Sequence, residues 1–315
     1  MTDEYCVVIP AHNSERFIEA TLASVYVQTR APQDVIVVDD GSTDRTVQIA
    51  AEAGARVVST AGQHGPSVAR NLGVHSTSAP LIAFLDADDE WLPEHAATLL
   101  PAFGDVATTF VGSNAEKFGS ELGTVGPRTG AGYAADVRDL LISENPVIQS
   151  SAIVRRDAFL TAGGYDESMR FSEDYDLWTR VAETGEFHHV NSTTVRRRMH
   201  AGQVTQRFRT ELVHAWWTVR RKTVARRLRI ASQFERSRVL QLLHQSAKLD
   251  IDWAIWTGDS TMLAIVRDEM RITDDELDLG TRLSTVGGLG QPALRLSQDV
   301  RCGSRSLLQF IQGQR

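Results

Sequence analysis

Short apolar runs alternate with stretches of helical pattern over residues 5–106, and this alternation constrains the fold more than any other feature. Runs rich in Val, Ile, Leu and Phe are candidates for four strands, at residues 6–9, 35–38, 56–58 and 81–85. Continuous apolar runs separated by helical segments are typical of parallel strands that are buried on both faces. We therefore expect an α/β fold in which helices cover a mostly parallel sheet.

The segments between these runs carry helix start and stop signals. Ser14 precedes an apolar face of helical period over residues 15–28 and is the expected N-cap. Asp44 is the expected cap of the next helix, and Gly54 its expected end. Pro66 stands at the first turn of a third helix. In a parallel sheet with such helices, ligands bind beyond the carboxyl ends of the strands.

The pattern changes in the second half of the chain. Residues 106–132 are rich in Gly and Thr and predict irregular strands or a loop. Further elements are expected as helices at 135–143 and 173–184, and as strands at 149–154 and 194–199. After about residue 205 the alternation stops and helices follow, the first with an apolar stripe of Trp216, Val219, Val224 and Leu228. A domain boundary is therefore expected near residue 205.

Charge and cysteine content limit the functional classes. A net charge of -7 argues against a general nucleic-acid binder, because phosphate neutralisation needs a basic surface. Cys6 and Cys302 lack metal-ligand spacing, and Cys6 is expected as a buried free thiol in a reducing compartment. Asp3 and Glu4 replace the basic start of a secretory signal, and no apolar run approaches the roughly 18–20 residues that cross a bilayer. We expect a cytoplasmic protein, at most attached to the inner face of the membrane.

Two carboxylates, Asp86 and Asp88, directly follow the fourth expected strand. Carboxylate oxygens in one crevice are ligands for a hard divalent cation such as Mg²⁺ or Mn²⁺. Such a cation neutralises a departing diphosphate. The alternative is an acidic turn that caps a helix before Pro93, and the residues alone leave both open.

Other polar groups follow other expected strands. Asp40 can accept the ring N–H of a uracil, or it can belong to an Asp–Gly turn. His12 can hold a nucleoside, and Arg70 can reach a phosphate or a base near a helix N-terminus, or form a surface salt bridge. Asp174, in an acidic run that starts a helix, can act as general base for an acceptor hydroxyl, although helix dipoles also favour acids there.

Taken together, the segments VVIPAHNSE, VIVVDDGSTD, GPSVARNLG, LIAFLDADDEWLP, GGYDES and SEDYDLWTR resemble the large inverting family 2 of GT-A glycosyltransferases. The resemblance covers residues 5–205. It implies a GT-A catalytic domain over 1–205 and a C-terminal helical region over 206–315 for acceptor, membrane-surface or oligomer contacts. The implied activity is transfer of a sugar from a nucleotide diphosphate donor, UDP-sugar by default, to the hydroxyl of a carbohydrate, lipid-linked or small-molecule acceptor.

The resemblance also implies roles for individual residues. The nucleotide-sugar-binding positions would be Pro10, Ala11, His12, Glu15, Asp40, Arg70, Asp86 and Ala87. Many relatives have Tyr where His12 stands. Asp88 would be a direct ligand of Mn²⁺ or Mg²⁺, with Asp86 and His200 as further ligands, and Asp174 would be the catalytic base.

The segment 207–238 is strongly basic. Residues 205–239 contain ten Lys and Arg against two Glu, with Trp216 and Trp217 nearby. A basic helix of this kind can rest on an anionic membrane or meet a lipid-linked acceptor. It can equally be a solvated face that acids elsewhere in the fold balance.

Three other functional classes are alternatives to a sugar-transferring enzyme. A catalytically silent sugar-nucleotide-binding module would bind the donor without turnover, but Asp88 and Asp174 are both present and favour turnover. A phosphohydrolase with Asp86 as nucleophile would leave the other motifs unexplained. A dinucleotide oxidoreductase is weaker still, because no G-x-G-x-x-G follows Ile9.

Overall fold

The computed structural model describes residues 4–126, 136–201 and 208–276. The chain divides into two compact units, Met1–Arg207 (unit 1) and Phe208–Arg315 (unit 2). Cys6 is a buried free thiol, as predicted, whereas Cys302 lies outside the described residues.

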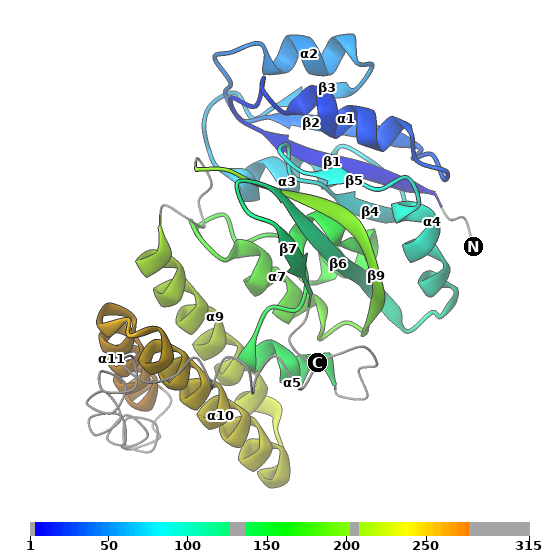
Figure 1. The fold of residues 1–315 in the computed structure, drawn as a ribbon. Coiled ribbons are helices and arrows are strands. Elements are labelled where there is room, and N and C mark those ends of the chain that lie inside the picture. Colours follow the sequence, from blue (N-terminus) through cyan, green and yellow to red (C-terminus); the bar gives the residue numbers. More distant parts are fainter. Residues whose placement is uncertain (1–3, 127–135, 202–207, 277–315) are drawn as a thin grey trace. The chain divides into compact units, whose positions relative to one another are not determined.

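Nine strands in the described part of unit 1 form one sheet in the order β3-β2-β1-β4-β8-β6-β9-β5, with β7 paired to β6 (Figure 1). Their bounds are β1 (Tyr5–Ala11), β2 (Asp34–Asp39), β3 (Arg56–Ser59), β4 (Leu81–Phe84), β5 (Glu90–Trp91), β6 (Thr108–Gly119), β7 (Gly123–Val125), β8 (Ile153–Arg155) and β9 (Glu186–Met199). The first four strands pair in parallel, as predicted from their apolar runs. Beyond β4 the sheet is mixed, because β8 runs antiparallel to both β4 and β6.

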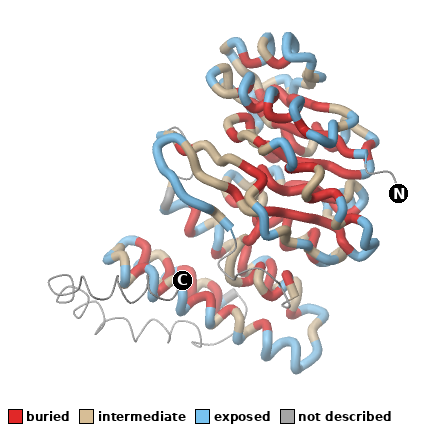
Figure 2. Tube along the Cα trace, turned by 45° about the vertical axis from the view of Figure 1, so that its right-hand side comes forward, coloured by how far each residue is buried: buried red, intermediate tan, exposed pale blue. Residues whose placement is uncertain are grey.

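Helices cover both faces of this sheet, and buried positions follow the strands (Figure 2). They are α1 (Ile18–Tyr26), α2 (Thr46–Glu52), α3 (Pro66–His75), α4 (His95–Leu99), α5 (Val137–Ser143), α6 (Arg156–Thr161) and α7 (Glu173–Val181), with 3-10 turns at Leu100–Gly104 and Gln149–Ser151. Leu22 of α1 shares a core cluster with Ile9 of β1. Gly73 of α3 lies against Val8, where an added Cβ would be 2.4 Å from Cγ1. Because neighbouring residues of a strand point to opposite faces, α1 and α3 cover opposite sides.

One predicted helix start is wrong. Helix α1 begins at Ile18 rather than at Glu15, and no side chain caps it. The carbonyl oxygen of Ser14 accepts the backbone N–H groups of Phe17 and Ile18. The Ser14 hydroxyl donates to the carbonyl of His12 and not to the start of the helix. The chain therefore forms a turn before the helix. The N-cap residue of α2 is Arg45 and not the predicted Asp44, although the Asp44 carboxylate accepts the N–H of Thr46 at 3.0 Å.

Of the two structures predicted for 106–132, irregular strands are confirmed in the described part, because β6 and β7 form there and the register of β6 with β9 shifts near Thr108 and Asn114. Residues 127–132 lie outside the described part. Strand β6 is twelve residues long and pairs in parallel with β9 over most of its length. Strand β9 has fourteen residues, well beyond the predicted 194–199. The predicted strand at 149–154 begins with a 3-10 turn, and only its end joins β8. Polar residues interrupt β6 and β9, so the apolar pattern does not reveal their full length.

Unit 2 contains α9 (Arg209–Ile230), α10 (Gln233–Thr257) and α11 (Ser260–Glu276) in its described part. The predicted stripe on α9 is confirmed at its three later positions, but Trp217 is the buried tryptophan and Trp216 is 39% exposed. Arg220 pairs with Asp250 of α10, and Arg221 with Glu269 of α11, so charged groups also join these helices. Within the described residues, no helix combines the length and the apolar character that a membrane span requires.

Candidate active site

His12 and Asp40 follow the ends of β1 and β2 and touch each other. His12 Nδ1 lies 2.8 Å from the carbonyl oxygen of Asp40, which can only accept, so Nδ1 carries the hydrogen. His12 Nε2 then accepts from the side-chain amides of Asn13 at 3.0 Å and Gln63 at 3.2 Å. The orientation of the imidazole is therefore determined by its neighbours on both sides.

The Asp40 carboxylate is buried and holds the loop that leads into α3. Its Oδ1 accepts the N–H of His64 at 2.9 Å and the hydroxyl of Thr60 at 2.9 Å, and its Oδ2 accepts the N–H of Gly65 at 2.7 Å. Gly65 has φ +99°, a backbone conformation that favours glycine. The predicted contact of Asp40 with a base stays a prediction, because its oxygens bind residues of this loop here.

Two further residues of the predicted nucleotide-sugar pocket, Ala11 and Ala87, form hydrogen bonds within the protein through their backbone carbonyls. Ala11, which follows Pro10 at the end of β1, accepts the N–H of Asp40 at 2.8 Å. Ala87 accepts the Thr21 hydroxyl at 2.9 Å. The Glu15 side chain instead accepts the N–H of Arg45 at the start of α2.

Arg70 is a buried hub between three elements. Its Nη2 donates to Asp86 Oδ1 at 2.7 Å, after β4, and its Nη1 donates to Glu173 Oε1 at 3.0 Å, at the start of α7. The guanidinium also lies over the ring of Tyr165, 5.3 Å from its centroid. A buried cation needs such partners to offset its lost hydration, so the Arg70 ion pairs are internal and not at the surface.

Helix α3 thus connects the separate strand ends. The Asp40 carboxylate binds the backbone of Gly65, directly before this helix, and Arg70, one turn into the helix, binds Asp86 after β4 and Glu173 at the start of α7. The segments with Asp40, Asp86 and Glu173 therefore meet around one helix, although they are far apart in sequence.

The turn after β4 brings three carboxyl groups, those of Asp86, Asp88 and Asp89, close together. Burial, and then the neighbouring carboxylate of Asp86, raise the pKa of Asp88. Burial, and then Asp88 and Asp86, raise the pKa of Asp89 to about 8. A nearby cation would stabilise the ionised form of carboxyl groups that raise the pKa values of one another in this way.

The three predicted metal ligands are divided between two contacts. Asp88 Oδ2 lies 2.9 Å from His200 Nε2, whereas Asp86 pairs with Arg70. Among residues 4–126, 136–201 and 208–276, no group of three or more His, Cys, Asp and Glu side chains is arranged to hold a metal ion. Carboxylate oxygen and imidazole nitrogen are nevertheless donors that a divalent cation accepts.

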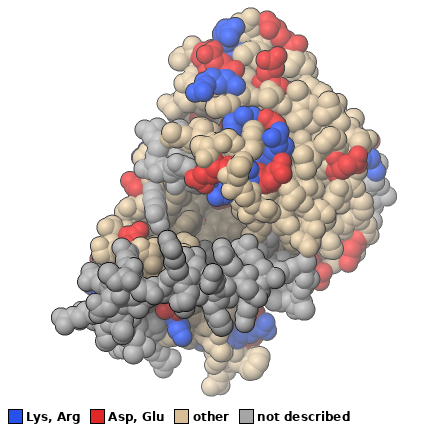
Figure 3. Space-filling model, viewed as in Figure 1, with Lys and Arg blue, Asp and Glu red and all other residues tan. Residues whose placement is uncertain are grey.

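Arg198 fixes the same turn from the side of β9, and sequence reasoning missed it. Its backbone N–H donates to Asp89 Oδ1 at 2.9 Å, and its Nε donates to the Asp88 carbonyl at 2.9 Å. Arg196 and Arg198 also pair with Glu90 of β5. Figure 3 shows acidic and basic side chains side by side on the visible face of unit 1.

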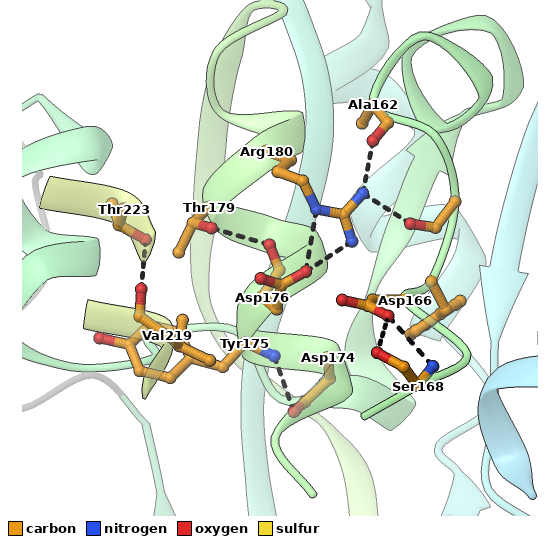
Figure 4. Close-up of polar contacts among 12 residues, drawn as sticks. Ala162, Asp166, Ser168, Asp174, Tyr175, Asp176, Thr179, Arg180, Val219 and Thr223 are labelled. Carbon is orange, nitrogen blue, oxygen red and sulfur yellow. Dashed lines mark hydrogen bonds and ion pairs between the residues drawn. The ribbon is translucent and has the colours of Figure 1, made fainter. Parts of the chain in front are cut away.

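Asp174 is a half-buried carboxylate in the first turn of α7. Its Oδ1 accepts the N–H of Tyr175 at 2.7 Å (Figure 4), and its Oδ2 accepts the amide of Asn145 at 3.2 Å. Burial, and then the neighbouring Glu173, raise the pKa of Asp174 to about 6. A carboxylate with this pKa is ionised at neutral pH and is a stronger base than an ordinary aspartate.

Asn145 is a second residue that the sequence did not reveal. Its Oδ1 accepts the N–H of Val147 at 3.1 Å, so its amide nitrogen must be the atom that faces Asp174. Asn145 lies in the loop after α5, 29 positions before Asp174 in α7. No local pattern marks such a pair.

Arg180 binds α7 to the glycine turn that precedes it (Figure 4). It pairs with Asp176 at 2.8 Å and donates to the carbonyls of Ala162 and, at 2.6 Å, Gly164. Gly164 has φ +68°, and an added Cβ would lie 2.8 Å from Asn71 Oδ1. A side chain at position 164 would therefore be strained and crowded, which favours glycine there. Through Arg180, this turn is bound to the helix that carries Asp174.

The family model for glycosyl transferase family 2 matches residues 6–161, and that for glycosyltransferase like family 2 matches residues 132–231. The chain belongs to glycosyltransferase family 2, and the predicted GT-A fold is confirmed.

One curated relative and two solved structures indicate the range of similarity. The succinoglycan biosynthesis protein ExoU of Rhizobium meliloti is 30% identical over 199 residues, which are 58% of this chain and 58% of that protein. The chain therefore matches less than two thirds of that relative. S. aureus TarS 1-349 in complex with UDP-GlcNAc superposes with TM-score 0.70 at 17% identity, covering 96% of this chain and 93% of TarS 1-349. The mannosyltransferase PcManGT of Pyrobaculum calidifontis, in complex with GDP-Man and Mn²⁺, gives TM-score 0.51 at 17% identity, covering 96% and 88%.

Proposed function

We propose that this glycosyltransferase inverts the sugar that it transfers, moving it from a nucleotide diphosphate donor to an acceptor hydroxyl with Asp174 as general base. The observation that carries this proposal is the link from Asp174 to the acidic turn after β4. Glu173, next to Asp174, shares Arg70 with Asp86. The buried guanidinium of Arg70 therefore links the segment that carries the proposed base to the acidic turn. We propose that this turn faces the diphosphate and its metal ion.

The proposed reaction is a single displacement. Asp174 accepts the proton of the acceptor hydroxyl while that oxygen attacks the anomeric carbon from the face opposite the leaving group. Tyr175 and Asn145 orient the two carboxylate oxygens through their N–H groups. Mn²⁺ or Mg²⁺, held by Asp88 and His200 with Asp86 nearby, would neutralise charge on the leaving nucleoside diphosphate.

A UDP-sugar is the first donor to test, and a GDP-sugar the second. TarS was crystallised with UDP-GlcNAc and PcManGT with GDP-Man and Mn²⁺. As acceptor we propose a saccharide intermediate of bacterial polysaccharide or glycolipid synthesis, since ExoU is a succinoglycan biosynthesis protein. Lipid-linked and small-molecule acceptors belong in the same screen.

Thermal unfolding with a panel of nucleotide sugars tests donor and metal together. We expect the true donor to raise the melting temperature in the presence of Mn²⁺, because a ligand at a hundred times its Kd stabilises the native state by about 2.7 kcal/mol. Excess EDTA or Asp88→Asn should remove most of this shift. Lack of a shift with every donor, or a shift that EDTA and Asp88→Asn leave intact, would contradict the proposed site.

The pH dependence of kcat/KM tests the base. Asp174 must be ionised to accept a proton, so kcat/KM should fall as the pH drops below about 6, the pKa of this carboxyl. Asn145→Ala removes a hydrogen bond that favours the ionised form, so it should move this acid limb to higher pH by up to about one unit.

Asn191→Ala is the matched control for this pH profile. Asn191 also takes part in a side-chain amide contact, but with Asn114 on β6. We expect its acid limb to coincide with that of the unaltered protein. An acid limb that Asn145→Ala does not move would show that Asn145 has no influence on the base.

A further inference from the structure

The connection between α9 and α10 exposes two large apolar side chains. Ile230, the last residue of α9, is 89% exposed, and Phe234, in the first turn of α10, is 78% exposed. They lie on either side of a two-residue connection, Ala231 and Ser232. Single exposed apolar residues are ordinary, but large exposed apolar side chains gathered at one helix connection indicate an interaction surface.

The same connection is strongly basic. Residues 226–238 contain five arginines and one acid, Glu235, in a chain of net charge -7. The arginines are Arg226, Arg227, Arg229, Arg236 and Arg238, of which the last three are exposed. Glu235 caps α10, because its carboxylate accepts the N–H of Ser232 at 2.9 Å. The helix start therefore already uses the one acidic group of this segment.

We propose that this α9–α10 tip, residues 226–238, binds an anionic membrane surface. Ile230 and Phe234 enter the boundary between headgroups and acyl chains, and the exposed arginines meet the lipid phosphates. Both parts are needed, since an apolar contact of two side chains is small and basic residues alone are screened by salt. This goes beyond the proposed sugar transfer and does not depend on it.

A second exposed apolar area on α10 lacks the matching charge. Trp253 and Trp256 are 45% and 59% exposed, and their ring centroids are 5.2 Å apart. Asp252 and Lys248 balance each other in charge near this pair, and Asp250 is already paired with Arg220. Charge complementarity therefore selects the tip, and not the tryptophan pair, for anionic lipid. The sequence suggested Trp216 and Trp217 as the apolar part of a membrane contact. Trp217 is fully buried, so the proposed apolar contact consists of Ile230 and Phe234 instead.

Vesicle sedimentation of the full chain tests the proposal. We expect it to sediment with vesicles that contain phosphatidylglycerol, to remain in solution with phosphatidylcholine alone, and to dissociate as salt is added. Each arginine at the surface contributes about fivefold in affinity. Arg229→Gln with Arg236→Gln and Arg238→Gln should therefore weaken binding by about a hundredfold.

Two further variants distinguish binding through Ile230 and Phe234 from nonspecific binding through other exposed apolar side chains. Ile230→Ser with Phe234→Ser should abolish binding to the anionic vesicles, whereas Trp256→Ala should bind like the unaltered chain; circular dichroism checks that each variant is folded. Equal binding to both vesicle types, or unchanged binding of Ile230→Ser/Phe234→Ser, would overturn the proposal. So would an absence of vesicle binding together with self-association that Ile230→Ser/Phe234→Ser removes, since the partner would then be a second copy of the chain.

Discussion

Replacing Asp174 by Asn should lower kcat by about 10²–10⁴-fold, the range that general base catalysis contributes. The amide oxygen can still accept the N–H of Tyr175, so the start of α7 should be preserved. The amide cannot accept a proton from the acceptor hydroxyl, however. Nucleoside diphosphate release in the presence of donor and acceptor measures the loss, and donor binding by thermal shift should change little.

Asp166→Asn is the matched control for this substitution. Asp166 lies in the turn before α7 and accepts the N–H and hydroxyl of Ser168 (Figure 4). The same chemical change there should leave kcat within about twofold, because the amide oxygen of Asn can still accept from Ser168 and Asp166 has no proposed role in the reaction. If Asp174→Asn retained full turnover, the proposed base would be wrong. If the unaltered protein bound donors but released no nucleotide with any acceptor, the silent-module alternative would gain support.

Replacing Arg70 by Met should destabilise the fold by about 3–5 kcal/mol, the range for removing one partner of a buried ion pair. Arg70 is the shared partner of Asp86 and Glu173, and its side chain is only 6% exposed. Its loss leaves two carboxylates without a counter-charge. Because Arg70 also lowers the pKa of Asp174, the acid limb of kcat/KM should move to higher pH.

Chemical denaturation with a double-mutant cycle measures this effect. Arg70→Met with Glu173→Gln should recover part of the lost stability, because one of the two unpaired charges is removed. Arg45→Met is the control: Arg45 pairs with Glu15 at 3.5 Å but is 72% exposed, so its loss should cost about 0–1 kcal/mol. Equal losses for Arg70→Met and Arg45→Met would mean that the buried network does not stabilise the site.

Local sequence was sufficient for much of the first half of the fold. The apolar runs of β1, β2 and β4 and the proline at the start of α3 lie where the sequence predicted strands and a helix. Gly54, with φ +86°, ends α2 as predicted. These signals are local, because burial on both faces and helix ends act on neighbouring residues. The ordered motifs likewise determined the family, which the family models confirm.

Only the tertiary structure decided which polar groups meet. Arg70 and Glu173 are 103 positions apart, and Asp88 and His200 are 112 positions apart. The partners of Asp40, the contact of Asn145 with Asp174 and the full length of β6 and β9 depend in the same way on which elements pack together. The sequence shows no periodic pattern for side-chain hydrogen bonds or strand pairing between distant segments. These contacts depend on the geometry of the folded backbone, which determines which segments lie side by side.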